Sequence, residues 1–220
     1  MKTNAPRILL LCNGEPPSRS LLRRLAGEAD MIVAADGGAN VALRSGVRPD
    51  VIIGDMDSIL PETRKALADS RVLRVRRQDN TDLEKALDFI SERGPAEVAI
   101  AGATGGRIDF TLGNLSVFWS YTRTLGITFV GDGWRALAVG RHRTVIAPRG
   151  TTVSLLPFGS CVGVTLRGLR YPLNDAAMGA GEIGVSNVVR TSPFRVTVRR
   201  GRMLLVIFYG AENRGAHPVW

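Results

Sequence analysis

The sequence predicts an α/β protein: an N-terminal doubly wound, mostly parallel sheet with helices on both faces, followed by a smaller all-β sandwich. Up to about residue 140, short apolar runs alternate with segments of helical period. Such alternation is typical of βαβ units, whose strands are buried on both faces. After about Gly140 the helical period disappears, and short β-rich runs follow one another between Gly and Pro residues. We therefore expect two domains, over residues 1–140 and 141–220.

Six apolar runs and the segments between them define the elements of the first half. Strands are expected over residues 7–12, 31–35, 51–53, 72–75, 98–101 and 127–130, and helices over 17–28, 38–46, 61–69, 81–92 and from about 110 to 124. Leucines at helical spacing predict the first helix. Pro61 suits a first helical turn, and Thr81 with Glu84 forms a capping box at the start of the fourth helix.

The second half shows the alternation and punctuation of an antiparallel β domain. Strands are expected over residues 144–147, 151–156, 162–166, 194–198 and 203–209. The segment 179–187, GAGEIGVSN, is predicted to be a glycine-rich loop that leads into a strand. The run 203–209 is uniformly apolar, which is typical of a core strand.

Composition restricts the classes of partner. Of the residues, 45% are hydrophobic and 22% are charged, and no apolar stretch approaches the ~20 residues of a membrane span. The net charge is +9, but the arginines are dispersed without a long basic run, so we expect an anionic small substrate and no nucleic acid. Cys12 and Cys161 lie far apart in apolar segments, which indicates buried thiols and a reducing cytoplasm.

The stretch PDVIIGDMDS, residues 49–58, is the strongest candidate for chemistry. An apolar strand ends at Gly54, and Asp55 and Asp57 follow two residues apart, so both acids can face one point. Paired carboxylates repel unless a cation or donors lie between them, and Mg²⁺ is the cation that oxygen ligands of this kind hold. The alternative is that Asp57 and Ser58 only open a turn or cap the helix near Pro61.

Polar clusters follow three other predicted strands. They are Asp36 with Gly37, the segment from Gln78 through Thr81 to Asp82, and Arg107 with Asp109. Glycines let a ligand approach the backbone, and the arginine fork suits phosphate oxygens. Each cluster also has a structural alternative: a tight turn, acids at a helix start, or an ion pair. Because parallel sheets bind ligands at the carboxyl ends of their strands, the joint placement predicts one site there.

Four blocks in the first half together resemble thiamine pyrophosphokinases: ADGGAN at 35–40, PDVIIGDMDS at 49–58, QDNTDLEKAL at 78–87 and GATGGRIDFTLGNL at 102–115. In the second half, YPLNDAAM at 171–178 and GVSN at 184–187 are similar to that family's thiamine-binding domain. The resemblance implies an ATP-binding catalytic domain over 1–140 and a thiamine-binding domain over 141–220. It also implies pyrophosphate transfer from ATP to thiamine with Mg²⁺, and a homodimer whose active sites are shared between subunits.

The resemblance assigns roles to individual residues. Asp55, Asp57 and Asp82 match the metal-handling acids, and Gln78, Thr81, Arg107 and Asp109 match positions that contact the triphosphate or the metal cluster. Asp36 and Gly37 are further expected at the ATP site, and Ser186 with Asn187 matches the segment near the pyrimidine ring of thiamine. Catalytic roles are expected for Asp55, Asp57, Asp82, Arg107 and Asp109. Many bacterial members read GGR-x-D-H, where this chain has Phe110.

Two other functions stay open at this point. One is a pyrophosphokinase for another heterocyclic alcohol, such as a hydroxymethylpterin. The other is a non-catalytic nucleotide- or RNA-binding regulator that retained the fold. The general base is also unassigned, since both Asp57 and Asp82 could accept the hydroxyl proton.

Overall fold

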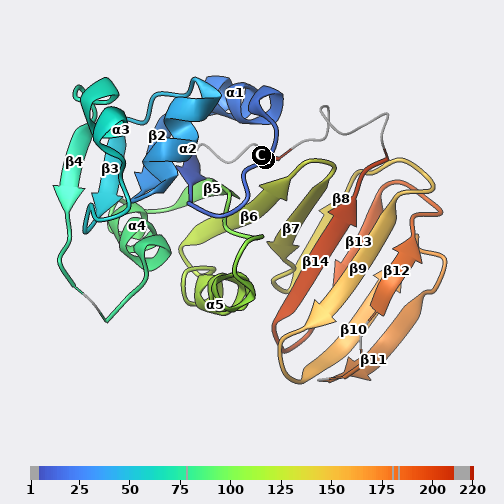
Figure 1. Ribbon diagram of the computed structural model, residues 1–220. Coiled ribbons are helices and arrows are strands. Elements are labelled where there is room, and N and C mark those ends of the chain that lie inside the picture. Colours follow the sequence, from blue (N-terminus) through green and yellow to red (C-terminus); the bar gives the residue numbers. More distant parts are fainter. Residues whose placement is uncertain (1–4, 78, 180, 183, 211–218) are drawn as a thin grey trace. The chain divides into compact units, whose positions relative to one another are not determined.

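The computed structural model describes residues 5–77, 79–179, 181–182, 184–210 and 219–220 (Figure 1). The chain forms two compact units, the first ending at Asp132 and the second beginning at Gly133. The unit boundary therefore precedes the expected one near Gly140, because the strand Trp134–Ala138 pairs within the second unit. Trp220 returns to the first unit, where it packs beside Val219 against the core.

The first unit contains a six-stranded sheet in the order β6-β5-β1-β2-β3-β4, and every pairing in it is parallel. The strands are β1 (Arg7–Leu11), β2 (Met31–Ala35), β3 (Val51–Gly54), β4 (Arg71–Arg74), β5 (Ala96–Ala101) and β6 (Leu125–Gly131). All six lie where the apolar runs predict them. The central strands β1 and β5 are buried at every residue except Arg7 and Glu97, as expected for strands covered on both faces.

Helices cover both faces of this sheet, as predicted. They are α1 (Arg19–Glu28), α2 (Gly38–Ser45), α3 (Pro61–Ala66), α4 (Asp82–Ser91) and α5 (Ile108–Val117), with a 3₁₀ turn η1 (Phe118–Ser120). Figure 1 shows α1 to α3 on one face and α4 and α5 on the other. The last helix ends earlier than expected, because Phe118 and Trp119 form a 3₁₀ turn and are buried in the core. The rings of Phe118 and Phe129 pack there in a T-shaped arrangement, with their centroids 5.2 Å apart.

The chain reverses its direction across the sheet between β1 and β5. From β1 it steps outward through β2 and β3 to β4, and α4 then returns it to β5 on the opposite side of β1. The carboxyl ends of β1 and β5 are adjacent, with Leu11 paired to Ala101. In sheets of this kind, the loops diverge at the reversal and leave a crevice for ligands.

The second unit is the predicted β-sandwich. One layer has the strand order β12-β9-β14-β7 and the other has β11-β10-β13-β8, all antiparallel. The strands are β7 (Trp134–Ala138), β8 (His142–Val145), β9 (Thr152–Pro157), β10 (Cys161–Arg167), β11 (Leu173–Met178), β12 (Gly184–Val188), β13 (Phe194–Thr197) and β14 (Met203–Phe208). Inward side chains from both layers form one apolar core, as Leu155 and Ile207 do with Val164 and Phe194.

Three strands of the second unit were not predicted. The residues of β7 fall within the span expected for the first domain, no strand is predicted at β11, and β12 overlaps the predicted glycine-rich loop. β11 and β12 are edge strands in which only Met178 and Asn187 are buried, so no apolar run marks them. Within the described part of the chain, no helix has the length and apolar character that crossing a bilayer requires.

Candidate functional site

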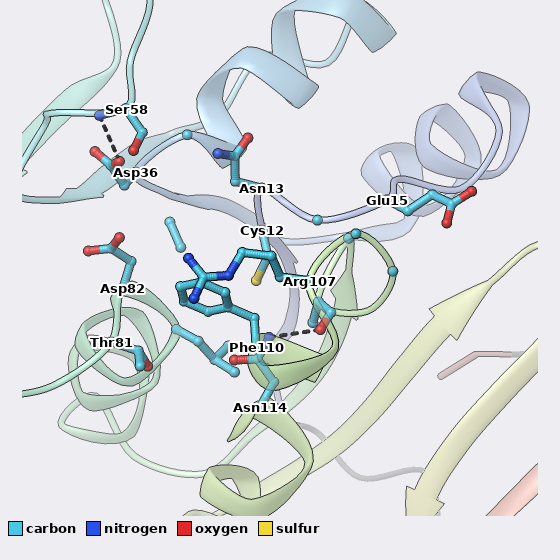
Figure 2. Close-up of a pocket in the computed structure, with 18 residues that line it drawn as sticks. Cys12, Asn13, Glu15, Asp36, Ser58, Thr81, Asp82, Arg107, Phe110 and Asn114 are labelled. Atoms are coloured by element: carbon cyan, nitrogen blue, oxygen red, sulfur yellow. Dashed lines mark hydrogen bonds between the residues drawn. The ribbon is translucent and has the colours of Figure 1, made fainter. Parts of the chain in front are cut away.

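A pocket of about 650 Å³ lies at the carboxyl edge of the parallel sheet, at the reversal between β1 and β5. The loops after β1, β2 and β5 line it, together with Ser58 and the first residues of α4 (Figure 2). Five of its lining residues are glycines: Gly14, Gly37, Gly102, Gly105 and Gly106. The sequence analysis predicted a site at this edge of the sheet, and the pocket occupies that position.

The loops after β1 and β5 are joined along their backbones. Gly14 N donates to Gly102 O at 2.7 Å, and Glu15 N donates to Thr104 O at 2.8 Å. A Cβ on Gly14 would lie 2.5 Å from Gly102 O, so a larger residue there would force the two loops apart. The sequence analysis did not assign Asn13–Glu15 to the site, although their position directly after a strand is the signal that identifies the other loops.

Asp36 is the buried acid of the pocket. Its backbone is left-handed, with φ of 42°, and the residue is only 1% exposed. Ser58 N donates to Oδ2 at 3.1 Å, whereas Oδ1 is buried without a hydrogen-bond partner. Burial is the largest cause that raises the pKa of this carboxyl above its usual value. A buried carboxylate oxygen without a protein partner is a position where a water, an ion or a ligand can bind.

Asp36, Asp55 and Asp57 form one acid group. Each offers a carboxylate oxygen, and the three oxygens lie within 4.8 Å of one another. The left-handed backbone of Met56, with φ of 73°, turns the chain between the two acids after β3, and Asp57 N donates to Asp55 Oδ1 at 3.3 Å. Oxygen donors at this spacing, one of them unpartnered, fit the ligand preference of Mg²⁺.

Asp82, which was predicted to join Asp55 and Asp57, lies at the start of α4 and takes part in a different contact. Its Oδ1 accepts a hydrogen bond from Lys85 Nζ at 2.9 Å, and the same Nζ is 3.9 Å from Asp55 Oδ2. The structure thus groups Asp36 with the two acids after β3 and links Asp82 to them through a lysine. The sequence analysis missed Lys85, because one cation on a helix has no distinctive pattern.

The neighbouring Thr81 is the N-cap of α4. Its Oγ1 accepts from Glu84 N at 3.2 Å and donates to Glu84 Oε2 at 2.9 Å, so the predicted capping box is present. Thr81 also lines the pocket. Gln78, which was predicted to contact the triphosphate, lies outside the described residues.

Arg107 and Asp109 form an exposed bidentate ion pair at the start of α5. Arg107 Nε lies 3.1 Å from Asp109 Oδ1, and Nη2 binds Oδ2. The hydrogen bonds between the two side chains, and to a smaller degree their opposite charges, raise the pKa of Arg107 and lower that of Asp109. The Phe110 ring lies 4.6 Å from the guanidinium, and Figure 2 shows Arg107 and Phe110 stacked within the pocket. Asn114, which the sequence analysis did not assign, donates to Ala103 O at 2.7 Å and fixes the loop after β5 to α5.

Comparisons with known proteins identify the family of this chain. Residues 22–129 match the family described as "Thiamin pyrophosphokinase, catalytic domain", and residues 142–203 match "Thiamin pyrophosphokinase, vitamin B1 binding domain". Thiamine pyrophosphokinase 1 of Oryza sativa subsp. japonica is 32% identical over 77% of this chain and 75% of its own length. The chain belongs to the thiamine pyrophosphokinase family.

Bacterial relatives extend the likeness over most of the chain. Thiamine pyrophosphokinase of Bacillus subtilis is 27% identical over 86% of this chain and 93% of its own. The crystal structure of thiamin pyrophosphokinase from Geobacillus thermodenitrificans is 26% identical, covers 93% of this chain and 98% of its own, and superposes with a TM-score of 0.81. The family therefore accounts for both units, and the resemblance inferred from the sequence blocks is confirmed.

The two residues expected near thiamine in this family lie on β12 and differ in their surroundings. Ser186 is exposed and left-handed, with φ of 58°. Asn187 is buried, and its side-chain amide accepts from Tyr171 N at 3.0 Å and donates to Tyr171 O at 2.8 Å. Both polar atoms of this amide are already engaged, so Asn187 fixes the 171 segment, and Ser186 is the accessible member of the pair.

We expect Asn187→Ala to destabilise the second unit by about 1–3 kcal/mol, because it removes a buried amide that binds both backbone groups of Tyr171. The matched change Ser186→Ala should alter the free energy of unfolding by no more than about 0.5 kcal/mol. Urea unfolding of both variants measures the difference. Equal losses in the two variants would contradict a structural role specific to Asn187.

The metal-free protein should become more stable at neutral pH when Asp36 is replaced by Asn. Burial raises the pKa of Asp36 in the folded state, so the folded state holds its proton more tightly than the unfolded chain. The free energy of unfolding therefore falls as the pH rises from the pKa of the unfolded chain, about 3.8, through the higher pKa of the folded state. Below about pH 3.8 the carboxyl is protonated in both states, and it no longer lowers the stability. In EDTA, Asp36→Asn should raise Tm at pH 7, and the gain should shrink toward pH 4. A gain that does not depend on pH would contradict this origin.

Proposed function

We propose that this chain is a thiamine pyrophosphokinase, which transfers pyrophosphate from ATP to the hydroxyethyl group of thiamine and releases AMP. The observation that carries the proposal is the pocket at the β1/β5 reversal, where Asp36, Asp82 and Arg107 meet glycine loops. Asp36 also belongs to the acid group with Asp55 and Asp57. The chain's membership in the family supports the choice of substrates. The first unit binds ATP, and the second unit binds thiamine, with Ser186 near its pyrimidine ring.

The glycine loops and Arg107 bind the polyphosphate. Gly37, Gly105 and Gly106 line the pocket without side chains, so phosphate oxygens can reach backbone N–H groups. Arg107 presents a planar fork on the same wall, and Asp109 and Phe110 hold its orientation. The net charge of +9 adds long-range attraction for a nucleotide.

Asp36, Asp55 and Asp57 are the residues that would hold Mg²⁺. Asp82 is linked to this group by Lys85, whose ammonium contacts both Asp82 and Asp55. When bound, Mg²⁺ neutralises phosphate oxygens and orients the nucleotide. The unpartnered Oδ1 of Asp36 and the spacing of the three carboxylates support this assignment. The acids also suit the permanent positive charge of the thiazolium ring.

In the transfer step, the hydroxyl oxygen of thiamine bonds to the β-phosphorus of ATP. The bond from that phosphorus to the oxygen bridging the α- and β-phosphates breaks, and AMP leaves with the bonding electrons. A carboxylate, Asp57 or Asp82, accepts the hydroxyl proton. Phe110 has no titratable group, so it takes no part in this proton transfer. Transfers of this type depend mostly on positioning and charge stabilisation, which the loops and Arg107 provide.

We propose further that the chain acts as a cytoplasmic homodimer with active sites shared between subunits. Ile108, Phe110 and Leu112 on α5 are each more than half exposed, which is unusual for large apolar side chains on one helix and supports a protein contact there. Cys12 and Cys161 are both buried free thiols, as expected in a reducing compartment.

An assay of AMP release tests the function directly. With ATP and Mg²⁺, the purified chain should form equal amounts of AMP and thiamine diphosphate when thiamine is present, and neither product without it. Release with a hydroxymethylpterin in place of thiamine would indicate the other pyrophosphokinase. Salt-dependent RNA binding without AMP formation would indicate a regulator.

Replacing Asp57 by Asn should lower kcat by about 10² or more, because one transition-state contact through the acid group is lost. The control is Asp69→Asn, at an exposed position outside the pocket that pairs only with Arg48 in the contacts described. This control should retain turnover close to that of the parent chain. Near-normal turnover of Asp57→Asn would remove Asp57 from the mechanism.

A further inference from the structure

Lys85 is the one basic side chain that is buried in the described part of the chain, with its side chain 3% exposed. It is also one of only three lysines among 29 basic residues, the others being Lys2 and Lys65. A chain that uses arginine almost everywhere has a compact ammonium at the one buried position, where a wide guanidinium fork would need more room. The location of this ammonium therefore calls for an explanation.

The Lys85 ammonium lies between two sets of acids. Nζ donates to Asp82 Oδ1 at 2.9 Å on the same helix, and it lies 3.9 Å from Asp55 Oδ2 on the loop after β3. Asp55 is a member of the three-acid group with Asp36 and Asp57. The fixed positive charge thus contacts Asp82 and Asp55, and Asp55 connects it to Asp36 and Asp57.

We propose that Lys85 is a positioning residue that serves as the internal counter-ion of this acid cluster. It stabilises the clustered carboxylates while no cation is bound, and it holds Asp82 beside Asp55. The same fixed charge repels an incoming cation, so it lowers the affinity for Mg²⁺ alone and makes tight metal binding depend on the phosphates that arrive with it. This inference rests on the metal site proposed above.

At these short distances, Coulomb's law sets the effect of the Lys85 charge on the acids. Without Lys85, the acids repel one another in the metal-free protein and attract a divalent cation more strongly. A merely structural ion pair between α4 and the β3 loop has a different consequence. Its removal would destabilise the protein by the same amount with and without Mg²⁺.

The test is thermal unfolding of Lys85→Met in EDTA and across a titration with Mg²⁺ alone. We expect a lower Tm than the parent in EDTA, a larger rise in Tm with Mg²⁺, and a titration midpoint at least ~10-fold lower. The control is Lys65→Met, an exposed lysine on α3, which should follow the parent in both conditions. An equal loss of Tm with and without Mg²⁺, at an unchanged midpoint, would overturn the proposal.

A second variant separates the loss of the charge from a general folding defect. Lys85→Gln carries no charge but can still donate a hydrogen bond to Asp82, so it should show the same shift in midpoint. If Met and Gln variants both fold only with Mg²⁺, the counter-ion role is supported. If both stay unfolded with and without Mg²⁺, the lysine is needed for packing alone and the proposal fails.

The outcomes separate this inference from the proposed function. A parent chain that makes thiamine diphosphate, with an unchanged Mg²⁺ midpoint in Lys85→Met, contradicts the counter-ion role and leaves the function in place. If the parent chain makes no thiamine diphosphate but Lys85→Met shows the predicted shift in the Mg²⁺ midpoint, the counter-ion role is supported and the proposed function is contradicted.

Discussion

Mutual repulsion among four carboxylates is the constraint around which the first unit's site is built. Asp36, Asp55 and Asp57 present oxygens within 4.8 Å of one another, and Asp82 reaches them through Lys85. The protein opposes this repulsion with a hydrogen bond from Ser58 N and with one ammonium. Burial first, and the neighbouring acids after it, raise the pKa of Asp36, and its Oδ1 has no partner within the described residues. Under the proposed function, Mg²⁺ would supply the positive charge that these acids lack.

The parallel sheet explains why these groups meet. Ala35 on β2 pairs with Ile53 on β3, so the residues that follow both strands emerge side by side. A Cβ on Gly54 would lie 2.7 Å from Asp36 Cβ, so a glycine is required for Asp36 to occupy its position. The reversal between β1 and β5 opens the space opposite, and Gly14 lets the two loops there approach closely. The sheet thus determines the site's position, while close-packed glycines determine its shape.

Local sequence predicts much of this arrangement. The six parallel strands follow from continuous apolar runs, and the capping box at Thr81 follows from spacing alone. The grouping of Asp36 with Asp55 depends on strand register, which no local pattern encodes, and Lys85 meets Asp55 only because α4 packs against β3. The strands β11 and β12 could not be predicted from the sequence, because each lies at the edge of its sheet and an edge strand does not require a continuous apolar run. Asn187 matched a family segment, yet its amide is engaged by Tyr171, which only the fold reveals.

Phe110 illustrates how one departure from a family pattern is accommodated. Many bacterial members carry a histidine there, which can donate a hydrogen bond, whereas a phenyl ring cannot. In this chain the ring lies against the Arg107 guanidinium, and Asp109 binds the guanidinium's edge. Phe110 therefore orients the Arg107 guanidinium by stacking against it, and it makes no side-chain hydrogen bond of its own. Under the proposed function, charge stabilisation would depend on Arg107 and proton transfer on Asp57 or Asp82, so the two tasks would fall to different elements of the first unit.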